Sequence, residues 1–144
     1  EGLQFRISLR SDVYYLVRTS DESTDKIESS VVWHSWSNHE ILLLLVKRIQ
    51  TFFNHSFDIN SVKNLEQYRL SFYIDPVFEQ KFSDVGKWEN APMYRILMSL
   101  IRKRPRDLVK LCTLAARNAN EKNSKKINTE NLKAIFEEYS FLLS

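Results

Sequence analysis

Apolar and polar positions along the chain follow two different periods, and each period predicts a different element. From Phe5 to Leu9 the two kinds of residue alternate strictly, which predicts a short strand with one buried face. Apolar residues at helical spacing predict a short helix over residues 13–17. The polar stretch 19–30 is typical of a surface loop, and the apolar residues 31–33 predict a second strand.

The clearest helix begins after Ser37. Ser37 and Glu40 have the spacing of a capping box, in which each side chain satisfies a backbone N–H at the helix start. Apolar residues continue at helical spacing to about Phe53, and Leu43, Leu44 and Val46 widen the stripe. We therefore expect this helix to be buried on more than one side.

One ambiguous amphipathic stretch and three further helices follow. Residues 60–75 are amphipathic and end at Pro76, and the polar stretch 83–92 is a connection. A helix is predicted over residues 93–101, another begins at Pro105, and the last begins at Asn128 or Thr129. The helix after Pro105 should face inward through Leu108, Val109, Leu111, Cys112, Ala115, Ala116 and Ala119. The fold is therefore expected to be mostly α.

Composition narrows the class of protein. The chain has 144 residues, of which 43% are hydrophobic, enough for one core. Gly2 and Gly86 are its only glycines, which excludes a Gly-rich phosphate loop and so a complete nucleotide-hydrolysing enzyme. A lone Cys112 fits a reducing cytoplasm, and the longest apolar run, residues 41–46, is far short of the roughly 20 residues that span a bilayer. Because the first residue is Glu1, we expect a piece of a longer polypeptide.

Histidines and nucleophiles offer little chemistry. His34, His39 and His55 have no metal-ligand spacing, and no catalytic motif occurs, so neither a metal site nor a catalytic residue is predicted. Arg48 and His55 loosely resemble the Arg and His pair of helical HEPN ribonucleases, although a solvated arginine and a helix-end histidine are the plainer interpretation. A ribonuclease is kept as one alternative.

Basic residues gather where one helix ends and the next begins. Residues 102–110 hold five cations and one carboxylate, Asp107, for a net charge of +4. Arg106 in the first turn of a helix would suit a phosphate, because its planar fork adds to the positive end of the helix dipole. A solvated turn and a DNA-backbone contact are the competing interpretations. A freestanding nucleic-acid-binding module would use Arg102, Lys103, Arg104, Lys122, Lys125 and Lys126.

A resemblance to a known family rests on short motifs in order. Residues 104–108, Arg-Pro-Arg-Asp-Leu, the apolar positions after them up to Ala119, residues 127–132 and residues 138–140 resemble the C-terminal helical part of bacterial P-loop ATPases of the AAA+ origin-recognition and STAND branches. Residues 5–12 are similar to the core strand that this family places after its Walker B strand. Val32 and Trp33 resemble the next strand.

The resemblance implies an architecture and a role. Residues 1–36 would be a remnant of a parallel α/β core with one or two strands, and residues 37–144 a helical lid bundle. Arg10 would occupy the sensor 1 position and Arg106 the sensor 2 position, both near the terminal phosphate. The chain would be the nucleotide-sensing lid of an ATP-driven switch, not an enzyme by itself because Walker A and Walker B are absent.

The resemblance also implies cofactors and partners. ATP and Mg²⁺ would bind to the full-length parent and not tightly to this fragment. The partners would be the rest of the ATPase core, DNA and further copies of the parent, with no membrane involved. A DNA-linked or antiviral defence setting in the cytoplasm is expected from the same family relationship.

Overall fold

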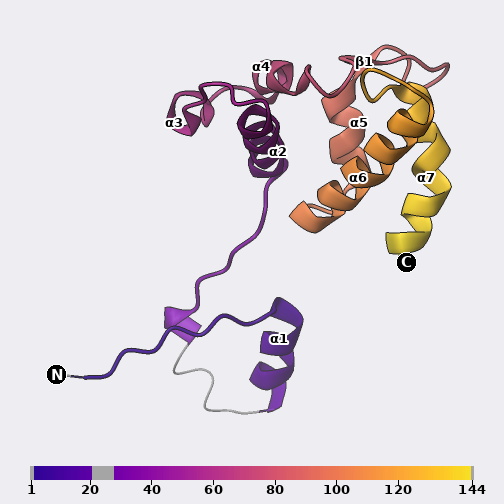
Figure 1. Ribbon diagram of the computed structural model, residues 1–144. Coiled ribbons are helices and arrows are strands. Elements are labelled where there is room, and N and C mark those ends of the chain that lie inside the picture. The colour runs from indigo at the N-terminus through magenta and orange to yellow at the C-terminus, as the bar shows by residue number, and fades with distance from the viewer. Residues whose placement is uncertain (1, 21–27, 144) are drawn as a thin grey trace. The chain divides into compact units, whose positions relative to one another are not determined.

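The computed structural model describes residues 2–20 and 28–143. The chain divides into two compact units, Glu1–Ser35 and Trp36–Ser144, and each is described by itself. The secondary structure is mostly helical (Figure 1), which confirms the predicted mostly-α fold. Within the described part of the chain, no helix is both long enough and apolar enough to cross a membrane.

In the described residues of the N-terminal unit, an α-helix is followed by a short 3-10 turn. Helix α1, Ser11–Ser20, confirms the predicted helix and extends it at both ends. The Asp12 carboxylate accepts a hydrogen bond from the backbone N–H of Val13 at 3.0 Å. Arg18 pairs at 2.8 Å with Glu28, the first residue of the turn η2, Glu28–Ser30. Of the loop predicted at 19–30, residues 21–27 lie outside the described residues.

The strand predicted at residues 5–9 is wrong for this structure. Residues 2–10 form no strand, and the apolar side chains of the alternating pattern are exposed, by 80% at Phe5 and Ile7. A strand needs a neighbour for its backbone hydrogen bonds, and among the described residues none lies beside this segment. The apolar side chains that the alternation predicts to be buried are therefore exposed to solvent.

The strand predicted at residues 31–33 is also absent. The Trp33 ring stacks on Tyr15 at 5.7 Å between ring centres and meets Tyr14 edge to face at 5.2 Å. These aromatic contacts, not strand pairing, hold the segment against α1. The predicted remnant of a parallel α/β core is therefore not found in the described residues.

The C-terminal unit begins with α2, Asn38–Phe52, which confirms the longest predicted helix. Both bonds of the capping box are present: the Ser37 hydroxyl accepts from the N–H of Glu40 at 3.2 Å, and the Glu40 carboxylate accepts from the N–H of Ser37 at 2.8 Å. The hydrogen bonds that this carboxylate accepts from the N–H and the hydroxyl of Ser37 lower the pKa of the Glu40 carboxyl. Ile41, Leu42 and Val46 are fully buried, so α2 contributes a large share of the core.

Short helical turns link α2 to the rest of the unit. They are α3, Ile59–Val62, α4, Gln67–Leu70, and the 3-10 turn η3, Ser71–Ile74. Gln50, buried in the last turn of α2, donates to the carbonyl of Tyr73 at 2.8 Å. The amphipathic pattern at 60–75 therefore becomes several turns instead of one helix.

A small sheet precedes the three C-terminal helices. Strands β1, Lys81–Phe82, and β2, Ala91–Pro92, pair antiparallel with Phe82 opposite Ala91. Both strands lie at the ends of the predicted connection, and two residues are too few for a periodic signal. A parallel bridge joins Phe78 to Ile127, so the chain before β1 is tied to the loop before the last helix.

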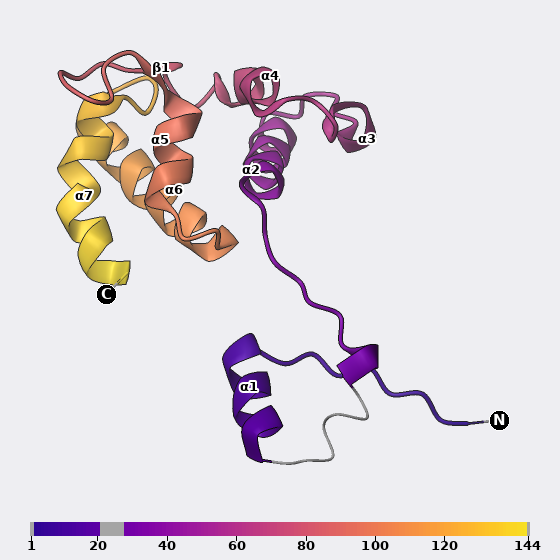
Figure 2. The ribbon, with the colours of Figure 1, turned by 180° about the vertical axis from the view of Figure 1, so that it is seen from behind.

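Helices α5, Met93–Leu100, α6, Pro105–Glu121, and α7, Thr129–Leu143, confirm the three predicted C-terminal helices. In both ribbon views α6 and α7 run side by side in opposite directions (Figures 1 and 2). The amide of Asn131 at the start of α7 donates to Asn118 near the end of α6 at 3.0 Å. A polar contact therefore fixes the closed end of the hairpin.

The inward face predicted for α6 is correct in part. Leu108, Leu111 and Ala115 are buried by 98% or more, as expected. Val109 and Ala116, however, are exposed, and they line a groove instead of the core. The apolar stripe of α6 is wider than the surface that its neighbours cover.

The capping box makes a stability prediction. Changing Ser37→Ala should lower the free energy of unfolding by about 1 kcal/mol, because the backbone N–H of Glu40 loses the hydroxyl to which it donates. Urea unfolding followed by circular dichroism measures the change. Thr51→Ala, at an exposed site on the same helix, is the matched control, and equal losses in both variants would contradict the capping role.

The single cysteine makes a reactivity prediction. Burial raises the pKa of the Cys112 thiol to about 12, so little reactive thiolate exists near neutral pH. At about pH 8, iodoacetamide should modify the folded chain at least a hundredfold more slowly than the denatured chain. A mass-spectrometric time course measures both rates, and similar rates would contradict the protection of this thiol in the folded chain.

Candidate anion-binding site at the start of α6

The site is built on a tight turn between α5 and α6. Lys103 has a positive φ of 52°, a left-handed conformation that costs a lysine roughly 1 kcal/mol. Arg104 is extended, as the residue before a proline must be, and Pro105 occupies the first position of α6. No side chain caps this helix start. The backbone N–H groups at the start of α6, which form the positive end of its dipole, can therefore bind solvent or a ligand.

Basic side chains surround this uncapped end. Arg102, Lys103, Arg104 and Arg106 are all exposed, and the Arg106 side chain is 73% exposed. Positive side chains and the helix dipole add to one another here, so the first turn of α6 attracts anions. An arginine at this place can hold two oxygens of a phosphate with its two terminal nitrogens.

Asp107, the one carboxylate among these cations, is buried. Its side chain is 3% exposed, its Oδ1 lies 3.8 Å from Nε of Arg106, and its Oδ2 has no hydrogen-bond partner among the described residues. A buried carboxylate with an unpaired oxygen is costly, and its nearest cation is held too far away for a hydrogen bond. A signal for this burial exists, since Asp107 shares a helical face with Leu111 and Leu114.

Tyr139 brings α7 to the same place. Its hydroxyl donates a long hydrogen bond, 3.4 Å, to the backbone carbonyl of Asp107. Burial first, then the charges of Asp107 and Cys112, raise the pKa of the Tyr139 phenol to about 12, and Arg102 partly opposes them. The first turn of α6 is therefore in electrostatic contact with the last helix.

Arg10, the other predicted phosphate contact, lies in the N-terminal unit. Its guanidinium makes a two-pronged pair with Asp12, at 2.6 Å and 3.2 Å, and both side chains are largely exposed. Arg10 and Arg106 belong to different units, so each is described only in its own surroundings.

The residues predicted for nucleic-acid binding form two groups. Arg102, Lys103 and Arg104 precede α6, whereas Lys122 and Lys125 follow it. Helix α6 has 17 residues and is about 25 Å long, so the two groups lie at opposite ends of it (Figure 2). Lys126 also belongs to the second group, and it pairs with Asp75 at 3.3 Å. The structure does not bring these cations together into one patch.

The two residues predicted for a ribonuclease have separate surroundings. Arg48 lines an apolar groove between α2 and α6. His55 follows α2, where its Nδ1 lies 2.9 Å from Oε1 of Gln50 and its ring stacks on Phe53. His39 is likewise occupied, with its Nε2 2.7 Å from the carbonyl of Lys63. In the described part of the chain, no group of three or more His, Cys, Asp or Glu residues is placed to hold a metal ion.

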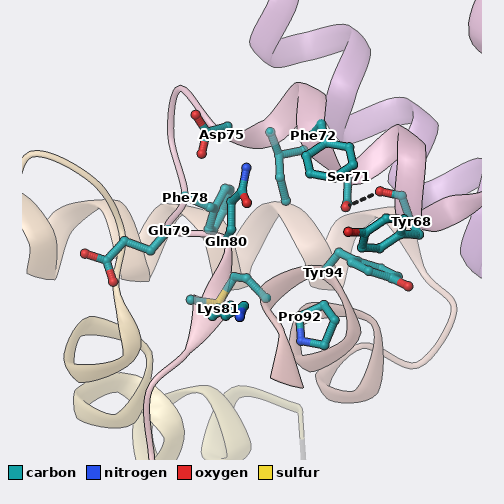
Figure 3. Close-up of a pocket in the computed structure, with 12 residues that line it drawn as sticks. Tyr68, Ser71, Phe72, Asp75, Phe78, Glu79, Gln80, Lys81, Pro92 and Tyr94 are labelled. Atoms are coloured by element: carbon teal, nitrogen blue, oxygen red, sulfur yellow. Dashed lines mark hydrogen bonds between the residues drawn. The ribbon is translucent and has the colours of Figure 1, made fainter. Parts of the chain in front are cut away.

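A small cavity of about 70 Å³ lies where η3 meets β1 and β2 (Figure 3). The rings of Tyr68 and Tyr94 face each other at one side of it, and Pro92 lies beside Tyr94. The Ser71 hydroxyl donates to the carbonyl of Tyr68 at 2.6 Å, and Asp75, Glu79 and Lys81 also line the cavity. The volume is well below the roughly 300 Å³ at which ligand pockets begin, so this cavity is not the candidate site.

The comparisons with known proteins identify one family. Residues 39–143, which cover nearly all of the C-terminal unit, match the family described as the FunZ-associated C-terminal helical domain. No curated protein and no solved structure matches the chain. Since the match covers well over half of the residues, the chain belongs to the family of FunZ-associated C-terminal helical domains.

Proposed function

We propose that the chain is the nucleotide-responsive helical lid of a P-loop ATPase, in which Arg106 contacts the terminal phosphate of ATP. One observation carries the proposal: an exposed arginine stands in the first turn of an uncapped helix, among three other exposed cations. This arrangement suits a phosphate better than any other ligand class, because charge, backbone N–H groups and a planar fork act at one place. The family description, FunZ-associated C-terminal helical domain, is compatible with a helical unit at the C-terminal end of a longer protein.

The proposed switch depends on the competition for Arg106. Without nucleotide, the one carboxylate that pairs with the guanidinium among the described residues is the distant one of Asp107, at 3.8 Å. A terminal phosphate offers more charge and accessible oxygens, so Arg106 turns toward it, and hydrolysis removes that partner. Because α6 is tied to α7 through Tyr139 and through Asn118 with Asn131, the hairpin follows as one body.

The remaining parts of the proposal concern groups outside the C-terminal unit. Arg10 is the second contact to the same phosphate and must release Asp12 to reach it. ATP and Mg²⁺ are held by a Walker A loop and a Walker B acid in the ATPase core, outside this chain. The chain by itself therefore binds nucleotide weakly and does not hydrolyse it.

The two alternatives receive less support. A nucleic-acid-binding face would need its cations along one surface, whereas the two groups lie at the two ends of α6. A ribonuclease would need Arg48 and His55 to act at one place, whereas Arg48 lines the apolar groove and the His55 ring stacks on Phe53.

The role of Arg106 can be tested with inorganic triphosphate. A nuclear magnetic resonance titration of the full chain should give saturable shifts at the backbone amides of residues 106–108, and Arg106→Ala should weaken binding by about tenfold. The free energy of unfolding should change by less than about 0.5 kcal/mol, because the side chain is exposed.

Arg95→Ala is the matched control, since Arg95 is exposed on α5 of the same unit. If both variants weaken triphosphate binding equally, the effect comes from the general loss of one positive charge, and Arg106 is not a specific contact. If Arg106→Ala unfolds the chain, the arginine is structural and the proposal is wrong.

Substitution of Asp107 is expected to have the opposite effect on triphosphate binding. Changing Asp107→Asn keeps the shape of the buried side chain but removes its negative charge, so triphosphate binding should become several-fold tighter. The same titration measures this affinity. Weaker binding would mean that the carboxylate holds Arg106 in its binding orientation instead of competing with the phosphate.

A further inference from the structure

An apolar groove of about 280 Å³ lies between α2 and α6, apart from the anion site. Helix α2 contributes Leu44, Leu45 and Ile49, and α6 contributes residues from one side of its apolar stripe. Part of this surface is open to solvent, since Val109 is 37% exposed. Helix α6 lines the groove with Leu108, Val109, Cys112, Thr113 and Ala116. Val77 and Phe78, before β1, and Ile127, before α7, complete the lining.

Most of the charges around this groove are positive, although the exposed Glu40 lies one helical turn from the lining residue Leu44. Arg48 is exposed and is the only charged residue among those that line it. Thr113 also lines it, and this residue lies one helical turn from both Lys110 and Arg117, which are exposed on α6. Cations therefore border the groove on both of its helices, and no carboxylate is among its lining residues.

We propose that this groove binds an amphipathic helix of a partner polypeptide, with the apolar face of that helix in the groove and acidic residues against Arg48, Lys110 and Arg117. A groove between two helices takes the apolar side chains that a third helix presents at spacings of three and four residues. Acidic residues on either side of that stripe complete the charge complementarity.

The lining favours a protein segment over a nucleic acid. Bases bind to protein surfaces by stacking on exposed aromatic rings, whereas the walls of this groove are aliphatic and its one aromatic residue, Phe78, is 1% exposed. A phosphate backbone would use the cations but leave the apolar floor uncovered. A second copy of the chain is disfavoured by its net charge of +3.

Synthetic peptides of about four helical turns test the proposal by fluorescence anisotropy against the full chain. One peptide has leucines at spacings of three and four with glutamates elsewhere, a second has lysines in place of the glutamates, and a third has the composition of the first in shuffled order. The first should bind at least tenfold more tightly than the other two. Equal binding of the first and third peptides would overturn the proposal.

Two pairs of variants locate the binding surface. Ala116→Trp fills the groove from an exposed position on α6 and should weaken binding of the acidic peptide at least tenfold, whereas Ala134→Trp, at an exposed position on α7, should leave it unchanged. Arg48→Glu should weaken it similarly, and Arg69→Glu, the same charge change on α4, should not. Circular dichroism confirms that each variant is folded.

Three results would overturn the proposal. In the first, Ala116→Trp binds the acidic peptide as well as the parent chain does. In the second, a single-stranded oligonucleotide binds with dependence on Arg48 and Lys110 but not on Ala116, which identifies a nucleic-acid surface. In the third, sedimentation shows a dimer of the chain that Ala116→Trp dissociates, which identifies a second copy as the occupant.

Discussion

The packing of α6 against α7 is the constraint on which the rest of the structure depends. Leu111 and Leu132, both fully buried, lie on these two helices, and the contact of Tyr139 with the backbone of Asp107 extends the packing to the first turn of α6. Apolar burial of this kind has no preferred direction, so the polar contact between Asn118 and Asn131 supplies the alignment. The position of the basic turn in space follows from this hairpin.

Helix α6 presents three surfaces with different chemistry. Its buried face builds the core, its first turn gathers cations around an uncapped end, and the edge of its apolar stripe remains open beside α2. Because a helix of this length moves as a rigid rod, any ligand that displaces the first turn also displaces the groove. The proposed phosphate contact and the proposed partner helix would therefore be coupled through one element, without a separate relay of side chains.

The N-terminal unit illustrates the limit of local pattern. Strict alternation from Phe5 to Leu9 predicts a strand, yet the segment is extended, unpaired and apolar on its exposed side. Strand formation depends on hydrogen bonds to a neighbour, so the pattern specifies which face should be buried but not what covers it. A helix is different, because its backbone bonds close within the segment, and the helices predicted after Ser37, over residues 93–101, at Pro105 and at Thr129 are all present.

The sequence by itself determined the features that depend on neighbours within a few residues. These are the capping box at Ser37, the helix start at Pro105 and the cluster of cations before Pro105. The last two features locate the candidate anion site. Only the tertiary structure decided that Asp107 is buried with an unpaired oxygen, that Ala116 faces a groove, and that the lysines near Lys125 lie a helix length from Arg104. The reason is physical: hydrogen bonds along a helix are local, whereas burial and the distance between charges depend on which helices pack together.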